Sequence, residues 1–281
     1  MTPRPTDAEL VALSDGAALA TRRRPGRPGT PDVVLLHGGP GLWDYLEPLA
    51  DLIGEEASTY RYDQRGCGAS TPSALQSIDR SVADLEELRR HWGLERMVLI
   101  GHSFGAALAL AYAAAFPARV SVLGHLSGVG IGDWRTPFGA EVRRRRAPFE
   151  ARLAELTTAT RTPEQEVEWR TLTWATDYAD LRAGLAAAGA MARSPHAIND
   201  RANREIGYPD ADQIGWAAAT ECPVYFVHGT ADPRPAANAM QLADRTPIAR
   251  KRVVSDAGHL PWVEQPEQVR ELLLEIVRAG R

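Results

Sequence analysis

The sequence predicts an α/β domain with a mostly parallel central sheet that helices cover on both faces. Six short apolar runs are typical of strands buried on both sides, and helical patterns separate several of them. The stretch from about residue 132 to 216 differs, because it contains helical patterns and no convincing strand. We therefore expect a core of residues 1–131 and 217–281 and a helical cap, or lid, of residues 132–216 above the strand ends, where open α/β sheets bind ligands.

The strand candidates are short and follow one another along the core. Residues 9–22 predict a β-hairpin, with its turn at Asp15 and Gly16. The apolar runs follow at residues 33–36, 59–62, 97–100, 120–123, 224–227 and 251–254. Each is expected to be buried on both faces.

Three stretches of the core predict helices. Residues 81–92 place apolar side chains on one face, and residues 104–116 are apolar nearly all round. At the C-terminal end, Pro266 suits a first helical turn, and a buried stripe follows at Val269, Leu272, Leu273 and Ile276.

One lid helix has a clear start signal. Thr162 can cap it, Pro163 fits the first turn and Gln165 can complete a capping box. We expect this helix to continue far enough to place five residues on one face: Val167, Thr171, Trp174, Tyr178 and Leu181.

Composition and charge exclude several classes of protein. The formal net charge of the 281 residues is −4, so bulk electrostatics does not favour a nucleic-acid partner. No window approaches the roughly 20 apolar residues of a membrane span, and the first 30 residues lack the apolar core of a signal peptide. The two cysteines, Cys67 and Cys222, do not predict a disulfide framework. We expect a cytoplasmic protein, and oligomeric state is left open.

The lid also contains a run of four arginines, residues 143–146. A solvated helix face is the favoured interpretation of such a charge run. A site for an anionic group is the alternative.

The strongest chemical signal is Gly101-His102-Ser103-Phe104-Gly105, which matches G-x-S-x-G. An apolar strand precedes it and a helix follows it, which is the context of a nucleophilic serine on a strained turn. The glycines are needed because side chains at residues 101 and 105 would collide with neighbouring backbone. A turn with a capping serine is the structural alternative.

A nucleophilic serine needs a base, and the base needs an orienting acid. In this architecture the chain order is Ser, then Asp or Glu, then His. Asp232 and His259 each follow a predicted strand, so both can meet Ser103 at the carboxyl edge of the sheet. Asp256 is a competing acid, although its place in the same loop as His259 makes the approach harder. The other histidines are interpreted as structural.

The segment His37-Gly38-Gly39-Pro40-Gly41 could suggest a phosphate loop, but it matches neither the P-loop nor the dinucleotide-binding pattern. Acyl transfer requires two amide donors for the oxyanion. We expect one from Phe104, which follows the nucleophile, and one from Gly39, with Gly38 as second choice.

These motifs together resemble those of a known family. HGGPG at residues 37–41, DQRGCGAS at 63–70, the serine turn and GHLPW at 258–262 are similar to α/β-hydrolases of the prolyl aminopeptidase (proline iminopeptidase) group. The resemblance spans roughly residues 9–131 and 217–281. It implies the α/β-hydrolase fold, a Ser-Asp-His triad, a helical lid, release of an N-terminal residue, often proline, from peptides, and no metal or organic cofactor.

The lid departs from this family. Family peptidases are similar in holding the free amine of the substrate with lid carboxylates, often with a Trp-Glu pair, whereas here Ala175 follows Trp174. Asp177 lies one helical turn from Trp174 and could share its face. Trp174, Asp177, Glu168 and Glu205 are the candidate substrate-binding residues, and Glu166 and Asp180 are further carboxylates among which the sequence does not choose.

Three functions follow from these residues. The favoured one is a serine aminopeptidase that acts on short peptides through an acyl-enzyme. A hydrolase of small esters, lactones or amides with the same triad is the alternative, and a non-catalytic binding protein is the third. Cys67 is interpreted as a small packed side chain near the site rather than a nucleophile.

Overall fold

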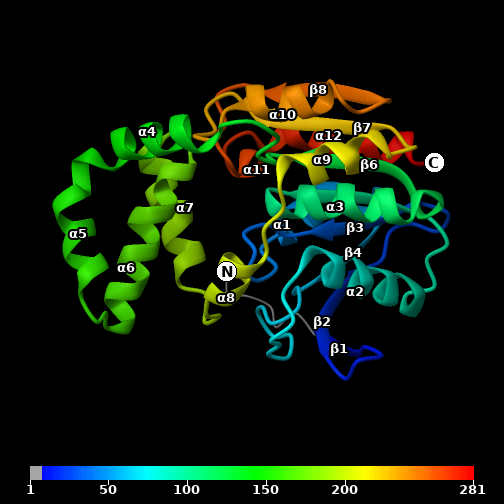
Figure 1. Cartoon of the computed structure of the whole chain (residues 1–281), viewed down its shortest axis with the longest axis horizontal. Coiled ribbons are helices and arrows are strands. Elements are labelled where there is room, and N and C mark those ends of the chain that lie inside the picture. Colours follow the sequence, from blue (N-terminus) through cyan, green and yellow to red (C-terminus); the bar gives the residue numbers. More distant parts are fainter. Residues whose placement is uncertain (1–7) are drawn as a thin grey trace.

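The computed structural model describes residues 8–281, so residues 1–7 of the predicted core lie outside the described residues. Its centre is an eight-stranded sheet (Figure 1). The strands are β1 (Glu9–Ala12), β2 (Ala18–Arg24), β3 (Asp32–Leu36), β4 (Ser58–Tyr62), β5 (Met97–His102), β6 (Val120–Leu126), β7 (Val224–Gly229) and β8 (Ala249–Val254). The predicted hairpin and all six predicted strands are confirmed.

The strand order is β1-β2-β4-β3-β5-β6-β7-β8. β1 pairs antiparallel with β2, and β2 pairs antiparallel with β4. All other neighbours are parallel, so β3 to β8 end at one edge of the sheet. The direction in which successive strands are added to the sheet reverses at β3. Open α/β sheets bind ligands near such a point, in the crevice beyond the carboxyl ends of the strands.

The expectation that every strand is buried on both faces is wrong for β8. This strand lies at the edge of the sheet, and Val253 is 58% exposed. An edge strand has a neighbour on one side only, so water reaches part of its surface.

Helices cover both faces of the sheet. One face packs against α2 (Ile78–His91), α3 (Phe104–Ala115), α9 (Asp210–Ala218) and α10 (Ala236–Ala243), through side chains such as Leu36, Leu99 and Phe226. The other face packs against α1 (Glu47–Ile53) and α12 (Pro266–Ala279). Val33, Leu35 and Ile100 point to this second face, which follows from the two-residue period of a strand. The short α11 (Pro261–Glu264) precedes α12.

The lid consists of helices between β6 and β7 that lie to one side of the sheet (Figure 1). They are α4 (Arg135–Arg146), α5 (Glu150–Thr158), α6 (Pro163–Trp174), α7 (Leu181–Ala192) and α8 (Asp200–Glu205), followed by α9 against the core. Short 3₁₀ turns follow α4 and α6, at Ala147–Phe149 (η3) and Ala175–Asp177 (η4). The capping box of Thr162 and Gln165 is confirmed at the start of α6.

The predicted length of that helix is wrong. α6 ends at Trp174, the 3₁₀ turn Ala175–Asp177 follows, and Tyr178 is extended. Asp180 then caps a new helix by accepting a hydrogen bond from the Ala183 N–H. Tyr178 and Leu181 therefore do not share a helical face with Trp174, and Asp177 lies in a turn.

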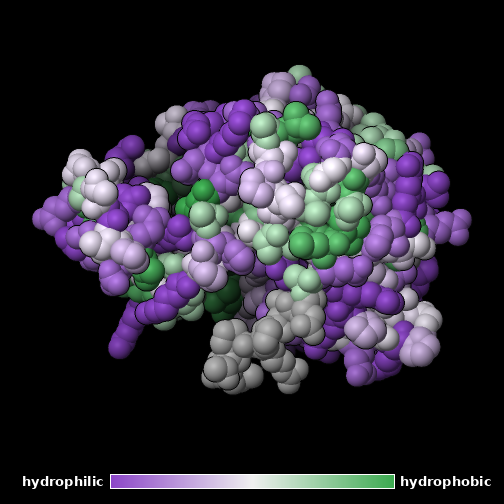
Figure 2. All heavy atoms as spheres, turned by 90° about the horizontal axis from the view of Figure 1, so that it is seen from below, coloured by the Kyte–Doolittle hydropathy of each residue, from purple (hydrophilic) through white to green (hydrophobic). Residues whose placement is uncertain are grey.

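Figure 2 shows one face of the molecule, on which hydrophilic side chains predominate and hydrophobic ones form smaller patches. Among residues 8–281 the helices are too short or too polar to cross a bilayer.

Candidate active site

Ser103 lies on a sharp turn between β5 and α3. Its backbone has φ 55° and ψ −117°, a conformation that non-glycine residues rarely adopt and that stores strain. A Cβ atom at Gly101 would lie 2.0 Å from the Gly105 carbonyl oxygen, and one at Gly105 would lie 2.2 Å from that of Leu36. The glycines on either side therefore permit this tight turn, which places Ser103 at the N-terminus of α3.

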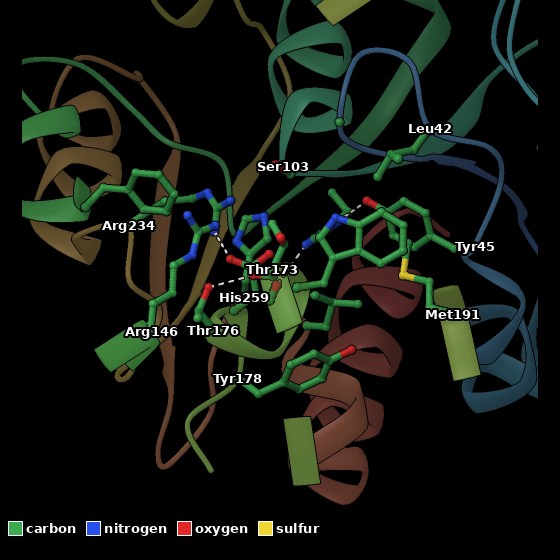
Figure 3. A pocket seen from close by; sticks show the side chains of 16 residues that line it. Leu42, Tyr45, Ser103, Arg146, Thr173, Thr176, Tyr178, Met191, Arg234 and His259 are labelled. Carbon is green, nitrogen blue, oxygen red and sulfur yellow. Dashed lines mark hydrogen bonds and ion pairs between the residues drawn. The ribbon is translucent and has the colours of Figure 1, made fainter. Parts of the chain in front are cut away.

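Asp232 and His259 follow β7 and β8, at the same edge of the sheet as Ser103. His259 Nδ1 lies 2.7 Å from Asp232 Oδ2, and the Asp232 side chain is fully buried. His259 and Ser103 line one cavity (Figure 3). Asp232 is not part of that lining and contacts the other side of the imidazole, at Nδ1. Asp256 is exposed and lies on the solvent side of the same loop, so the geometry favours Asp232 as the partner of His259.

The surroundings of Asp232 favour its charged form. Burial alone would raise its pKa, but the neighbouring His259, His228 and Arg234 reverse that effect and hold the pKa of Asp232 below its usual range. Arg234 also donates its backbone N–H to Asp232 Oδ1 at 2.9 Å. A charged carboxylate in this position can fix one imidazole tautomer and stabilise an imidazolium.

The glycine-rich loop after β3 faces Ser103. Gly38 donates its N–H to the Tyr45 hydroxyl at 2.9 Å, so this amide is already engaged. Gly39, with φ 55°, lines the cavity beside Ser103. Of the two glycines considered for an oxyanion donor, Gly39 is thus the one whose amide is not held by Tyr45.

A hydrogen-bonded chain joins this loop to the histidine loop. Burial lowers the pKa of His102 well below its usual value, with the nearby His259 as a second cause, so the ring is neutral. Its Nε2 lies 2.8 Å from the His259 carbonyl oxygen, which can only accept, so Nε2 carries the proton. His102 Nδ1 then accepts from the Tyr45 hydroxyl at 2.7 Å. Tyr45 therefore fixes the positions of Gly38 and of the His259 backbone together.

The second glycine-containing motif of the sequence, DQRGCG, supports the same loop. The Gln64 N–H donates to His37 Nε2 at 3.0 Å, and the Gln64 side-chain amide donates to the His37 carbonyl at 2.7 Å. Asp63 accepts from the N–H groups of Asp44 and Ala69. The motif thus has a structural role beneath the HGGPG loop.

Cys67 in this motif is buried. Burial raises the pKa of its thiol to about 12, so it is a thiol and not a thiolate at neutral pH.

The cavity above Ser103 has a volume of about 270 Å³. Core residues form its floor, and lid residues from α4, α6, η4 and α7 form its walls (Figure 3). Much of the lining is apolar or aromatic: Leu42, Tyr45, Phe138, Trp174, Tyr178, Met191 and Leu260. The charged side chains in the lining are Arg146, Asp177 and Arg234.

The structure separates the four candidate substrate-binding residues into two pairs. Trp174 and Asp177 line the cavity. Glu168 forms an ion pair with Arg152 and is 41% exposed, and Glu205 forms one with Arg201 and is 42% exposed. Neither of these glutamates lines the cavity, because their helices turn them outward, so the expectation that they contact substrate is not supported. Of the further carboxylates, Glu166 pairs with Arg161 and Arg170, and Asp180 caps α7.

Asp177 is not a free carboxylate. Its Oδ1 accepts from Arg234 Nη1 at 2.7 Å. Arg234 in turn lies 3.6 Å from Asp232 Oδ1 and stacks on Phe138. Burial would lower the pKa of Arg234, but Asp177 and Asp232 raise it, so it stays charged.

The arginine run differs from the favoured expectation of a solvated face. Arg143 and Arg144 are exposed, as expected. Arg145 instead donates to the carbonyl oxygens of Thr176, Tyr178 and Ala231, and Arg146 lines the cavity. The last turn of α4 packs on η4 and the core, which turns half of the run inward.

The turn η4 is fixed to the loop of the core that contains His259. The His259 N–H donates to the Asp177 carbonyl at 2.7 Å. Glu264 accepts from the N–H groups of Gly258, Ala179 and Asp180. The wall that contains Asp177 is therefore attached directly to the loop that contains His259.

A second cavity, of about 370 Å³, lies on another side of Ser103 and shares Gly39 and Arg234 with the first. Its charged lining residues are Arg135, Arg234 and Asp210. Asp210 is exposed and accepts from the Gly132 N–H. Ser103 therefore lies between two spaces, which suits a substrate with a group on each side of the bond that breaks.

Sequence reasoning missed three residues near the site. Arg234 lies two residues after Asp232, and its pairing partner Asp177 is far away in the sequence. His228, the penultimate residue of β7, has its Nε2 3.3 Å from Asp232 Oδ2, and the spacing of four residues between the two was the available signal. Tyr45 gives no pattern in the sequence, because its role depends on contacts with both Gly38 and His102.

Among residues 8–281, no cluster of three or more His, Cys, Asp or Glu side chains is arranged to hold a metal ion.

The comparison with known protein families bears on this geometry. Residues 33–272 match the model of the alpha/beta hydrolase family. The chain belongs to this family. This match confirms the predicted fold, and the proline iminopeptidases among the relatives described next confirm the predicted resemblance.

Curated relatives of the chain include hydrolases with different printed activities. A proline iminopeptidase from Saccharolobus solfataricus is 48% identical over 87 residues, which cover 29% of this chain and only 28% of that relative. A putative carbamate hydrolase, RutD, from Escherichia coli O6:H1 is 28% identical over 94% of both chains. The solved structure of a proline iminopeptidase-related protein from Thermus thermophilus is 25% identical, with a TM-score of 0.74 over 97% of both chains.

Proposed function

We propose that this chain is a serine hydrolase that cleaves an ester or amide bond of a small substrate through an acyl-enzyme. The observation that carries the proposal is the 2.7 Å contact between His259 and a fully buried Asp232, with His259 and Ser103 lining one cavity. Ser103 on its strained turn and the oxyanion loop beside it add support. An intact set of this kind is also the reason to prefer an enzyme over a binding protein.

The mechanism assigns one role to each residue. The Ser103 oxygen attacks the substrate carbonyl carbon while His259 Nε2 takes the hydroxyl proton. The carbonyl oxygen becomes negative and accepts from the N–H groups of Gly39 and Phe104. His259 then protonates the leaving alcohol or amine, and the bond to the carbonyl carbon breaks.

The acyl-enzyme is resolved by water. His259 takes a proton from the water as the water oxygen attacks the acyl carbon. The bond between this carbon and the Ser103 oxygen then breaks, and His259 returns the proton to Ser103 as the acid leaves. Asp232 stabilises the imidazolium in both halves of the reaction and remains ionised. The reaction consumes one water and requires no cofactor.

Proline iminopeptidase activity is the second candidate. The names of two relatives and the position of Trp174 and Asp177 in the cavity favour it. The charges in the cavity favour a small ester or amide instead, because Asp177 is already bound by Arg234 and a substrate amine would have to displace that guanidinium. Outside this cavity, Glu168 and Glu205 point away from the site.

A matched substrate panel separates the two candidates. Proline 4-nitroanilide, N-acetylproline 4-nitroanilide and 4-nitrophenyl butyrate are assayed with the wild-type protein and with Ser103→Ala. The proposal expects hydrolysis of the ester that Ser103→Ala abolishes, and no requirement for a free amine. Cleavage of proline 4-nitroanilide that is lost on N-acetylation establishes the peptidase instead. Ester hydrolysis that persists in Ser103→Ala contradicts both.

A further inference from the structure

Arg146 is a cation in the cavity that forms no hydrogen bond or ion pair with the described residues, 8–281. Its side chain lines the cavity together with Arg234 (Figure 3). Its Nε is buried and makes no hydrogen bond to any residue among 8–281. A guanidinium has five N–H donors, and an unpaired buried donor has a free-energy cost, so a ligand that accepts from Arg146 is favoured there.

The surrounding structure holds Arg146 in this position. Its neighbour Arg145 donates to the carbonyl oxygens of Thr176 in η4, of Tyr178 just after η4, and of Ala231 in the core. Arg145 also pairs with Glu141 of the same helix. The end of α4 is thereby fixed, and Arg146 projects from it into the cavity with its side chain partly exposed.

The charges that line the cavity do not cancel. Arg234 and Asp177 form an ion pair, with 2.7 Å between Nη1 and Oδ1. Arg146 is left over, so the lining has two cations and one anion. Burial lowers the pKa of Arg146, and the negative charge of Asp177 opposes this shift. Arg146 nevertheless remains protonated at neutral pH, as arginines in proteins do. The second cavity beside Ser103 shares Arg234 and adds one cation, Arg135, and one anion, Asp210, so it does not offset the charge of Arg146.

The rest of the lining is suited to a small apolar body. Leu42, Met191 and Leu260 contribute aliphatic surface, and Trp174 and Tyr178 contribute aromatic surface. A molecule that fills the cavity therefore combines a compact apolar part with one anionic group. A planar carboxylate matches the fork of a guanidinium by accepting two parallel hydrogen bonds.

We propose that the substrate carries a carboxylate that Arg146 binds, while Ser103 attacks a carbonyl of an ester or amide elsewhere in the same molecule. Attack by Ser103 rests on the proposed function, whereas binding of a carboxylate by Arg146 does not. It assigns Arg146 a role in substrate specificity and makes the preferred substrate an anion, not a free amine.

The binding half is tested by titration calorimetry with three probes of nearly equal shape: benzoate, benzamide and benzylamine. The wild-type protein is expected to bind benzoate about 10- to 100-fold more tightly than benzamide, as for one charge-assisted hydrogen-bonded pair, and benzylamine least tightly. Arg146→Gln is expected to remove the preference for benzoate. Arg143→Gln is the matched control, because it makes the same change in the same helix at an exposed position, and it should retain the preference.

Equal binding of benzoate and benzamide to the wild-type protein overturns the inference, and so does a preference for benzoate that survives in Arg146→Gln. Tightest binding of benzylamine overturns it in favour of an amine site. Arg146→Lys is the second variant if Arg146→Gln does not fold. It keeps the charge and loses the planar fork, so a reduced but measurable preference is expected, and an unchanged one contradicts the role of Arg146.

The turnover half compares mono-4-nitrophenyl glutarate with 4-nitrophenyl butyrate. The expected result is a higher kcat/KM for the glutarate ester than for the butyrate ester in the wild-type protein, and loss of that ratio in Arg146→Gln. The exposed control Arg143→Gln should retain the ratio. Hydrolysis of both esters without discrimination overturns the inference and leaves the proposed hydrolase intact. Arg146-dependent binding of benzoate without hydrolysis of any ester contradicts the proposed function and leaves the anion site intact.

Discussion

Replacing Asp177 by Asn tests whether the cavity binds an anionic or a cationic substrate. The Asp177 carboxylate lines the cavity and pairs with Arg234, whereas its backbone carbonyl accepts from the His259 N–H. Asn keeps the size of the side chain and the backbone contact and removes the negative charge. The cavity then changes from two cations and one anion to two cations.

The size of the effect follows from the size of the cavity. A spherical space of about 270 Å³ is roughly 8 Å across, and two unit charges at that separation interact by about 2 kcal/mol at an effective dielectric constant of roughly 20. Asp177 is 18% exposed, so screening reduces its repulsion of a bound carboxylate to about 1–2 kcal/mol. This corresponds to about 5- to 30-fold in affinity.

The assay is steady-state hydrolysis of the same two 4-nitrophenyl esters. We expect kcat/KM for the glutarate ester to rise about 5- to 30-fold in Asp177→Asn, and that for the butyrate ester to stay within about twofold. A fall in glutarate hydrolysis with the butyrate ester unchanged refutes the reasoning about charge. Loss of proline 4-nitroanilide cleavage in this variant, with ester hydrolysis retained, would mean that Asp177 holds a substrate amine.

Three further substitutions test the supporting structure. Tyr45→Phe removes the hydroxyl between Gly38 and His102, and should lower kcat for the butyrate ester about tenfold with KM nearly unchanged; an unaltered kcat contradicts the positioning role. Gly105→Ala places a Cβ 2.2 Å from the Leu36 oxygen and should lower the free energy of unfolding, measured in urea, by about 3 kcal/mol or more. The control is Gly215→Ala in α9, whose Cβ meets no atom within 4 Å and which should leave the free energy of unfolding unchanged or raise it. The hydrogen bond from Arg89, supported by one from Tyr112, lowers the pKa of Glu86 to about 2. Because the unfolded pKa is about 4.3, ionised Glu86 stabilises the folded state above that pH, and this stabilisation is lost as the pH falls towards 2. The difference in unfolding free energy between the wild-type protein and Glu86→Gln should thus shrink between about pH 4.5 and 2, and a difference independent of pH would contradict the assignment.

The strands and the serine turn were predictable from the sequence because their causes are local. The strand β3 is a continuous apolar run, and Gly101 and Gly105 are required by contacts within the turn itself. Asp232 and His259 were predicted from chain order, since residues that follow parallel strands meet at one edge, and their side chains do lie in contact. For the same reason β8 was misjudged: its position at the sheet edge depends on strand order, which apolar runs do not reveal.

The lid was less predictable because its cavity-facing residues depend on how helices pack. α6 was expected to continue past Trp174, but the 3₁₀ turn after it brings the Asp177 carbonyl to His259. Glu168 and Asp177 were both candidates in the sequence. In the structure the Glu168 side chain points outward to Arg152, whereas Asp177 lines the cavity. Arg143 and Arg146 are chemically identical, and the anchoring of α4 by Arg145 decides which of them faces the cavity.

The proposed chemistry is tested most directly by covalent labelling of the folded protein with a fluorophosphonate, followed by peptide mass spectrometry. The proposal predicts stoichiometric phosphonylation of Ser103 in the wild-type protein, and no labelling in Ser103→Ala. His259→Ala should label far more slowly, because the base that takes the serine proton is gone. A folded wild-type protein that resists the reagent, or a label found on another residue, contradicts the assignment of Ser103 as the nucleophile.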